Sequence, residues 1–400
     1  MKKILALLLA VVMVLGMVAC ASKTETPAET TTTEPAATET TEETKTEEPA
    51  AEETTEEPAE ETGAVIQKVA LVTDVGTIDD ESFNQATWQG VKAYCEANGI
   101  EYTYYQPTED STEARCISID QAIKEGANVV VMPGYLFGAS IVREQEKYPE
   151  VYFIAVDVGA GDLTEDYATY YDPAANVVCA TFAEEQAGYL AGYAVVMDGY
   201  TKLGFSGGGG GENPACCRFG YGFVQGANDA AKAGGKTVEM NYSWLYGNSF
   251  SASSELQTML NGWYTNGTEV VFACGGSMCQ SAFAAAAAND GVVIGVDVDQ
   301  SSQSDTVVTS AMKGLTESVI YALGKFYAGE FDALGDISTV LGAANDAVGL
   351  PTATWSFKKF SVKDYDALLK SMKDGKVTVD NDYTKLAADL FANVKLNIVE

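Results

Sequence analysis

From residue 66 onward, short apolar runs alternate with longer segments of helical periodicity, and this alternation limits the fold more than any other feature. The apolar runs are continuous, which is typical of parallel strands buried on both faces. We expect strands at 69–73, 101–105, 129–132 and 152–157, separated by helices at 81–97, 112–124 and 140–147. The pattern predicts an α/β fold built on a doubly wound parallel sheet.

The pattern begins again near residue 176, which indicates a second unit of similar size. A long helix rich in Ala, Gly and Tyr is predicted over 176–197. Strands follow at 203–205, 237–244, 270–273 and 292–296, alternating with helices at 215–233, 253–264 and 280–289. A strand at 307–310 and a helix to about residue 327 are too little for a third unit. We therefore expect two lobes, the first formed by 66–175 plus 309–335 and the second by 176–308 plus 336–400.

The first 65 residues carry signals for export and anchoring. Met1–Ala19 combines two lysines, an apolar run and small residues, as secretory signal peptides do. The Met17–Cys20 junction is similar to a bacterial lipobox, so Cys20 is expected to be diacylated and to anchor the protein on the extracytoplasmic face of the cell membrane. Residues 21–62 contain fourteen Glu, two Lys and no aliphatic side chain larger than Ala, which predicts a disordered acidic stalk over 20–65.

Charge and composition exclude several classes of function. The chain has a net charge of −33, most of it in the region predicted to fold, so its field repels nucleic-acid polymers. It contains no histidine, the commonest general base. No P-loop or nucleophile elbow occurs, and the glycine run at 207–211 lacks the Lys-Ser/Thr ending of a phosphate loop. We expect no catalytic residues, no cofactor and no metal site.

Seven cysteines remain beyond Cys20, an odd number in a region large enough to fold without cross-links. Neither the adjacent Cys216 and Cys217 nor the spacing of Cys274 and Cys279 matches a common zinc pattern. We expect free or partly buried thiols.

The first strand leads into a turn that suits ligand binding. Asp79 or Asp80 is placed to cap the following helix, on whose first turn Phe83 and Asn84 lie. In open α/β sheets, ligands sit beyond the carboxyl ends of the strands. An aromatic face beside an amide suits a flat polar guest such as a nucleobase. The alternative, that Phe83 is a core residue, stays open from this stretch alone.

The aspartates of this turn are also similar to the calcium-binding cluster of nucleoside hydrolases. However, Val72 stands where the first aspartate of that cluster should be, and the spacing from Asp74 to Asp79 is one residue too long. A slip of one residue displaces a carboxylate by about 3 Å, which is too far for calcium coordination. The sequence therefore disfavours hydrolysis.

Further polar groups lie at the ends of other predicted strands. Asp157, Gly275, Asp297 and Asp299 follow strands directly, and Lys313 comes just after the strand at 307–310. Because these ends converge between the lobes, we expect the groups to share one crevice. Carboxylates and an ammonium suit vicinal hydroxyls, as in a ribose. Each group taken alone could instead cap a strand or form a surface ion pair.

Several stretches carry a family resemblance. They are K-V-A-L-V-T-D-V-G-T-I-D-D-E-S-F-N-Q (68–85), E-Q-A-G-Y-L-A-G-Y-A (185–194), L-G-F-S-G-G (203–208), R-F-G-Y-G-F-V-Q-G (218–226), the 247–250 turn, A-C-G-G (273–276), I-G-V-D-V-D-Q (294–300) and T-S-A-M-K (309–313). In this order they resemble the basic membrane protein family, lipoproteins that serve as purine nucleoside receptors for ABC transporters.

The resemblance implies a type I periplasmic-binding-protein fold, with two doubly wound parallel-sheet lobes joined by a hinge. It implies that a nucleobase stacks on Phe83 and on an aromatic residue of the second lobe, for which Phe219 is favoured and Phe223 comes second. Asp74, in the loop before Phe83, is counted with the ligand-binding residues.

The same resemblance implies the polar contacts. Asn84 and Asp157 are expected to bind the edge of the base, and Asp297 and Lys313 the ribose, while Gly275 lets the backbone approach the ligand. The expected partners are a nucleoside, an ABC permease and, through the lipid anchor, the membrane, with the protein a monomer. The alternative is a surface sensor or binding protein for a sugar-like or other small polar ligand, without transport.

Overall fold

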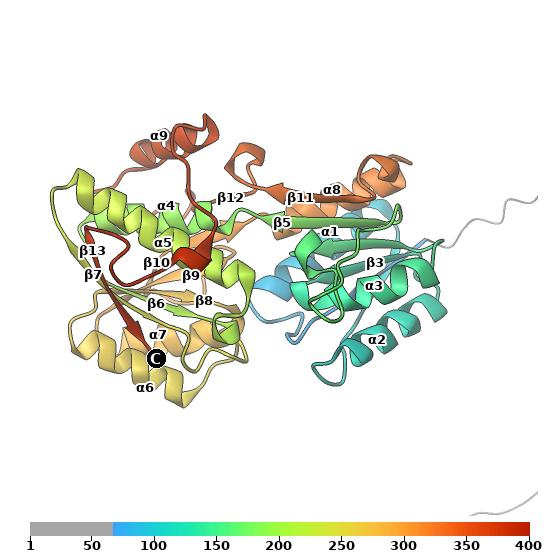
Figure 1. Cartoon of the computed structure of the whole chain (residues 1–400), viewed down its shortest axis with the longest axis horizontal. Coiled ribbons are helices and arrows are strands. Elements are labelled where there is room, and N and C mark those ends of the chain that lie inside the picture. The colour runs from blue at the N-terminus through green and yellow to red at the C-terminus, as the bar shows by residue number, and fades with distance from the viewer. Residues whose placement is uncertain (1–66) are drawn as a thin grey trace, which may run out of the picture. The chain divides into compact units, whose positions relative to one another are not determined.

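Two sheets organise residues 67–400, which are the residues described by the computed structural model (Figure 1). The expected signal peptide, the lipidation site Cys20 and the stalk lie outside the described residues. The first sheet has the strand order β11-β5-β4-β3-β1-β2 and is parallel throughout. The second has the order β12-β10-β9-β8-β6-β7-β13 and is parallel except for the short β12. The parts built on these sheets are called the first lobe and the second lobe.

The first lobe has helices on both faces of its sheet. Its elements are β1 (Lys68–Val72), β2 (Glu101–Tyr105), β3 (Val129–Pro133), β4 (Tyr152–Val156), β5 (Val177–Phe182), β11 (Ile337–Leu341), α1 (Phe83–Asn98), α2 (Thr112–Lys124), α3 (Gly138–Lys147) and α8 (Leu315–Tyr327). Helices α1 and α8 pack together, as do α2 and α3. Val69 and Leu71 of β1 join the core beneath α1, whereas Ala70 and Val72 join the core beneath α2 and α3. Burial of both faces is why this strand is apolar throughout.

The second lobe repeats this arrangement. Its elements are β6 (Lys202–Gly207), β7 (Val238–Ser243), β8 (Val270–Cys274), β9 (Val292–Asp297), β10 (Val307–Lys313), β12 (Val348–Gly349), β13 (Val394–Val399), α4 (Glu184–Asp198), α5 (Pro214–Ala233), α6 (Ser254–Thr265), α7 (Cys279–Ala287) and α9 (Val362–Lys373). Helices α4 and α5 lie on one side of the sheet and α6 and α7 on the other (Figure 1).

Glycines bring the backbones of α4 and α5 into direct contact. A Cβ atom on Gly188 would lie 2.1 Å from the carbonyl oxygen of Phe219, and one on Gly222 would lie 2.0 Å from that of Glu185. Larger residues at these positions would push the helices apart. The contact fixes the first turns of α5 against the start of α4, and both segments reach the site described below.

The helix predicted over 176–197 is wrong in its first part. Residues Val177–Phe182 form β5, and α4 begins only at Glu184. The β-branched Val177 and Val178 suit a strand, and β5 is held between β4 and β11. The prediction assigned β5 to the same helix as the Ala- and Gly-rich segment that follows it. Periodicity alone does not distinguish a short buried strand from a buried part of a helix.

The expected lobe boundaries are also corrected by the pairing of the strands. Strands β5 and β11 belong to the first sheet and β10 to the second, so boundaries at 175/176, 308/309 and 335/336 do not match the sheets. The described chain passes between the lobes at Ala183, Gly314 and Gly342. The N–H of Ala183 donates to the carbonyl of Leu341 at 2.9 Å, which joins two of these crossings. An apolar run identifies a strand but not the sheet in which it pairs.

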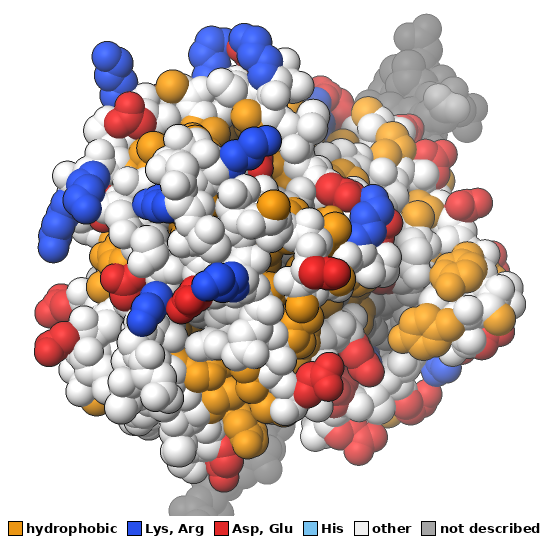
Figure 2. Space-filling view, turned by 60° about the vertical axis from the view of Figure 1, so that its left-hand side comes forward, with side chains coloured by type: hydrophobic (Ala, Val, Ile, Leu, Met, Phe, Trp, Pro, Cys, Tyr) orange, Lys and Arg blue, Asp and Glu red, His pale blue; other side chains and the backbone are white. Residues whose placement is uncertain are grey.

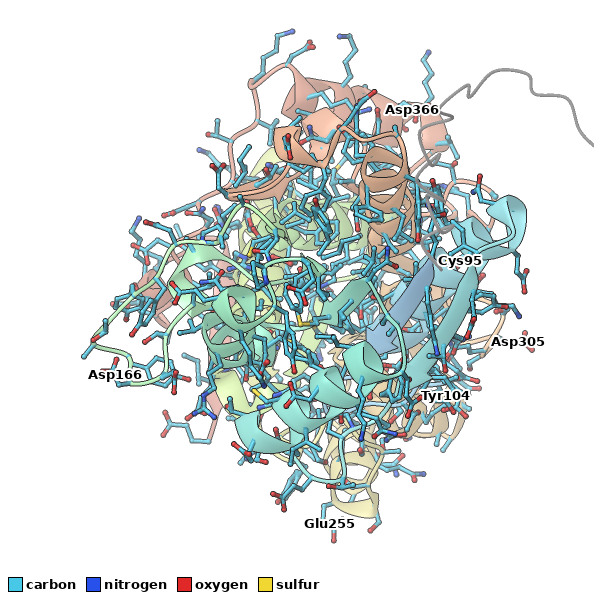
Figure 3. All side chains as sticks on the ribbon, turned by 90° about the vertical axis from the view of Figure 1, so that its right-hand side faces the viewer. Cys95, Tyr104, Asp166, Glu255, Asp305 and Asp366 are labelled. Carbon is cyan, nitrogen blue, oxygen red and sulfur yellow. The ribbon has the colours of Figure 1, made fainter. Side chains whose placement is uncertain are left out.

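The other predicted helices and strands are present, with their ends shifted by a few residues. The connection from β4 to β5 projects from the first lobe with Asp166 near its tip (Figure 3). Asp166 accepts hydrogen bonds from the amides of Ala168 and Thr169, which stabilises that turn. On the face shown in Figure 2, the basic side chains form no continuous band. Within residues 67–400, every helix is too short or too polar to cross a bilayer.

Candidate functional site

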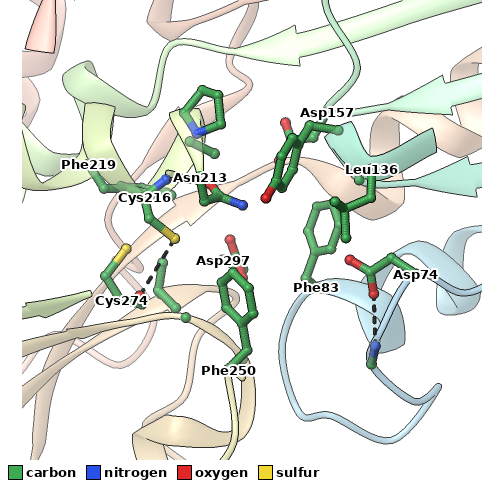
Figure 4. Close-up of a pocket in the computed structure, with 18 of the residues that line it drawn as sticks. Asp74, Phe83, Leu136, Asp157, Asn213, Cys216, Phe219, Phe250, Cys274 and Asp297 are labelled. Carbon is green, nitrogen blue, oxygen red and sulfur yellow. Dashed lines mark hydrogen bonds between the residues drawn. The ribbon is translucent and has the colours of Figure 1, made fainter. Parts of the chain in front are cut away.

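A cavity of about 580 Å³ lies at the carboxyl ends of strands from both sheets (Figure 4). The first lobe contributes the loop after β1, the start of α1, and the loops after β3 and β4. The second lobe contributes the start of α5, the loops after β7 and β8, and the ends of β9 and β10. The size is within the range of small-molecule sites, and the position is where doubly wound sheets bind their ligands.

Asp80 builds the wall at the start of α1. Its carboxylate accepts hydrogen bonds from the amides of Ser82, Asn84 and Gln85 at 2.9–3.1 Å, so it satisfies the free N–H groups of the first turn. Of the two predicted caps, Asp80 makes these contacts and Asp79 is exposed. Burial raises the pKa of Asp80, although its hydrogen bonds oppose the increase.

Asn84 lines the cavity, but its side-chain amide is held by carboxylates. Its Nδ2 donates to Asp74 at 2.9 Å and to Asp80 at 3.0 Å. Asp74 is fixed further by the amide of Gly76, and burial raises its pKa. Any group that binds the Asn84 amide therefore meets a side chain already oriented by two carboxylates.

Aromatic rings from both lobes line the cavity. Phe83 comes from α1 and Phe219 from α5, while Phe250 lies in the loop after β7 with a left-handed φ of 56° (Figure 4). The Lys313 ammonium lies 4.8 Å from the centroid of Phe83 and 5.6 Å from that of Phe219, which are cation–π distances. Phe83 is thus part of the cavity wall, although it also packs against the core.

Lys313 is the centre of a buried charge cluster. Its ammonium pairs with Asp157 of the first lobe, and it lies 3.5 Å from Asp297 and 3.6 Å from Glu184. Burial alone would lower the pKa of Lys313, but the three carboxylates outweigh it and raise the pKa. Burial raises the pKa of Asp157 to about 7 against the opposing effect of Lys313. Asp297 also accepts a hydrogen bond from Ser82 Oγ at 2.6 Å, which joins the two lobes.

Arg218 supplies a second cation. It lines the cavity, and its Nε donates to Glu184 at 2.6 Å. The Glu184 side chain is fully buried, and its carboxylate forms ion pairs with both Arg218 and Lys313.

Three glutamines of the second lobe donate hydrogen bonds to Glu81 of the first lobe. The Glu81 carbonyl accepts from Gln300 at 3.1 Å and from Gln303 at 2.9 Å, and its carboxylate accepts from Gln280 at 2.8 Å. Glu81 has a left-handed φ of 56°, a strained conformation for a residue with a side chain. These contacts connect the lobes beside Phe83.

The comparison with known proteins identifies the family. A family model described as ABC transporter substrate-binding protein, PnrA-like (Bmp), matches residues 66–382. This chain belongs to that family. Its members are the substrate-binding components of ABC transporters.

Among its relatives, this Bmp-family chain is 27% identical over 338 residues to the ABC transporter nucleoside-binding protein BmpA of Lactococcus lactis, covering 78% of this chain and 88% of BmpA. It is 29% identical to basic membrane protein A1 of Borrelia garinii, covering 64% and 71% of the two chains. An ABC transporter solute-binding protein of Aeropyrum pernix has a similar structure, with a TM-score of 0.61 at 21% identity over 80% of this chain and 88% of that one. The predicted type I periplasmic-binding fold is confirmed.

The cavity brings together most of the predicted ligand-binding residues of this Bmp-family protein. Those that line it are Asp74, Phe83, Asn84, Asp157, Phe219, Gly275, Asp297 and Lys313. Phe223 does not: it lies one helical turn beyond Phe219, fully buried, with its ring 5.4 Å from that of Phe272 in the core. A spacing of four residues places both buried phenylalanines on one side of α5, but only Phe219 belongs to the first turns of the helix, which line the cavity.

Sequence reasoning missed other lining residues, among them Phe250, Tyr135 and Arg218. Phe250 could have been found, because the loop after β7 ends at the same edge of the sheet as the other lining loops. Cys216 and Cys274 also line the cavity, and the Cys216 thiol donates to the Cys274 carbonyl at 3.7 Å. All seven cysteines of residues 67–400 are buried, with free thiols in this structure. No cluster of acidic residues and cysteines among those residues is arranged to hold a metal.

Proposed function

We propose that this protein binds a nucleoside, with purines favoured, in the cavity between its lobes and delivers it to an ABC importer. The observation that carries the proposal is the pairing of aromatic walls from both lobes with a carboxylate and ammonium cluster. Stacking of a base on an aromatic ring is worth about 1–3 kcal/mol. Asp297 and Lys313 suit ribose hydroxyls, and Asn84 and Asp157 suit the edge of a base.

The charge of the cavity supports a neutral guest. Lys313 and Arg218 are already paired with carboxyl groups of the protein, which are those of Asp157, Glu184 and Asp297. A phosphate group would add negative charge to this cluster, which is costly in a buried site. The similarity to the nucleoside-binding protein BmpA of Lactococcus lactis points to the same ligand class.

Isothermal titration with a panel of ligands tests the proposal. We expect adenosine, guanosine or inosine to bind with sub-micromolar affinity, a free energy beyond about −8 kcal/mol, and free ribose and nucleotides to bind far more weakly. Binding of a sugar or an amino acid, with no response to any nucleoside, would refute the ligand class. Uptake of the labelled nucleoside in a strain lacking the protein would separate import from sensing.

We also propose that Cys20 is diacylated and tethers the protein to the extracytoplasmic face of the membrane through its acidic stalk. The lipobox-like junction and the preceding signal peptide support this. Detergent phase separation of the full chain and its Cys20→Ala variant tests it. We expect the parent chain in the detergent phase and the variant in the aqueous phase, and equal partitioning would contradict the anchor.

A further inference from the structure

We propose that Glu184 is a positioning residue for ligand binding, which holds the two cations of the cavity, Arg218 and Lys313, in the orientation that presents them to the ligand. The inference rests on the proposed function, because it assigns a role within the same site. Glu184 was not among the residues predicted from the sequence.

The geometry of Glu184 is that of a shared counter-ion. Its Oε2 accepts from Arg218 Nε at 2.6 Å, and its Oε1 lies 3.6 Å from Lys313 Nζ. Oε1 accepts no hydrogen bond within residues 67–400, so its pairing with Lys313 is ionic. One carboxylate thus joins a cation on α5 to a cation at the end of β10.

The backbone fixes Glu184 at this point. It is the first residue of α4 and follows Ala183, where the chain enters the second lobe. The neighbouring Glu185 carbonyl lies so close to α5 that a Cβ on Gly222 would be 2.0 Å from it. The start of α4 and the turn of α5 that carries Arg218 therefore form one rigid unit.

The pairing through Nε leaves the rest of the Arg218 guanidinium for the ligand. Arg218 lines the cavity, and its terminal N–H groups make no hydrogen bond to residues 67–400. Because a guanidinium has five N–H groups in a fixed plane, holding Nε sets the direction of the other four. Without Glu184, Lys313 would keep Asp157 as its partner, whereas Arg218 would lose the one carboxylate to which it donates within residues 67–400.

Binding of inosine to four forms of the full chain tests the role: wild type, Glu184→Gln, Glu184→Asp and Glu185→Gln. Glu185 is a matched control, a buried carboxylate on the same turn that makes no ion pair with either cation. Loss of a charge-assisted contact is expected to weaken binding about tenfold or more in Glu184→Gln, with Glu185→Gln within about twofold of wild type. If the charge of Glu184 positions the cations, Glu184→Asp should bind inosine more tightly than Glu184→Gln. If Glu184 only fills space, Glu184→Gln should bind inosine more tightly, and that result would overturn the proposal.

A ligand-free measurement separates this inference from the proposed function. In ¹⁵N-arginine spectra, assigned with Arg218→Lys, the Nε–H of Arg218 should be protected from exchange with water. We expect Glu184→Gln to speed that exchange about tenfold or more and Glu185→Gln to change it little. If wild type binds no nucleoside, the proposed function fails while the exchange data still decide whether Glu184 holds Arg218. Unchanged exchange in Glu184→Gln would overturn the inference.

Discussion

Replacement of Lys313 by Met should destabilise the protein in a strongly pH-dependent way. The Lys313 side chain is only 3% exposed, and its ammonium faces Asp157, Asp297 and Glu184. After its removal, Asp297 still accepts from Ser82, and Glu184 still accepts from Arg218. Asp157 is left unpaired, because its Oδ2 loses Lys313 and its Oδ1 has no partner within residues 67–400.

The magnitude follows from this single unpaired carboxylate. Removing one partner of a buried ion pair costs about 3–5 kcal/mol while the other stays charged. In wild type the folded-state pKa of Asp157 is about 7, above the ordinary value of 3.8, so its contribution to stability is greatest below pH 3.8 and is lost as pH rises through 7. In Lys313→Met the opposing effect of the ammonium is gone and this pKa rises further. The loss of stability should therefore be largest above about pH 8 and should shrink toward about pH 5.

Urea unfolding followed by tryptophan fluorescence at about pH 8 and about pH 5.5 measures this. Lys325→Met is the control, because Lys325 pairs with Glu330 and lies near the Tyr321 ring at a solvent-accessible site, so its loss should change the stability little at either pH. Adding Asp157→Asn to Lys313→Met should restore most of the stability at high pH. A pH-independent loss, or one no larger than that of Lys325→Met, would refute the reasoning.

Three further predictions follow from the same contacts. Phe83→Ala should weaken nucleoside binding by more than about tenfold, or 1.4 kcal/mol, because it removes a ring on which the base stacks. Titration calorimetry measures this affinity, and a value near that of wild type would contradict the prediction. Gln300→Ala should increase the radius of gyration of the ligand-free protein in X-ray scattering, since it removes one bond to Glu81; an unchanged radius would show that the remaining glutamines hold the lobes. Phe223→Ala should lower the free energy of unfolding in urea by about 3–5 kcal/mol, while the folded protein keeps its ligand affinity. A loss of affinity without a loss of stability would show that Phe223 contacts the ligand.

The amino-acid sequence by itself determined the local elements and the chemistry at their ends. Continuous apolar runs such as Val69–Val72 indicated buried parallel strands, because only a strand covered on both faces has no polar side. Asp157 and Asp297 were found from their places directly after such strands, since parallel strands end at a common edge. Phe83 was found because it stands on the first turn of a helix that begins there.

Only the tertiary structure decided how these pieces join. Long-range pairing placed Val177–Phe182 between β4 and β11, although the sequence had been predicted to be helical from residue 176 onward. The position of the first turns of α5 at the cavity, which periodicity does not encode, made Phe219 a lining residue and left Phe223 in the core. Glu184 meets Arg218 and Lys313 only because glycines let α4 and α5 touch and because β10 pairs in the second sheet. Contacts between residues far apart in the chain depend on packing of the whole molecule, and local sequence carries no direct signal of them.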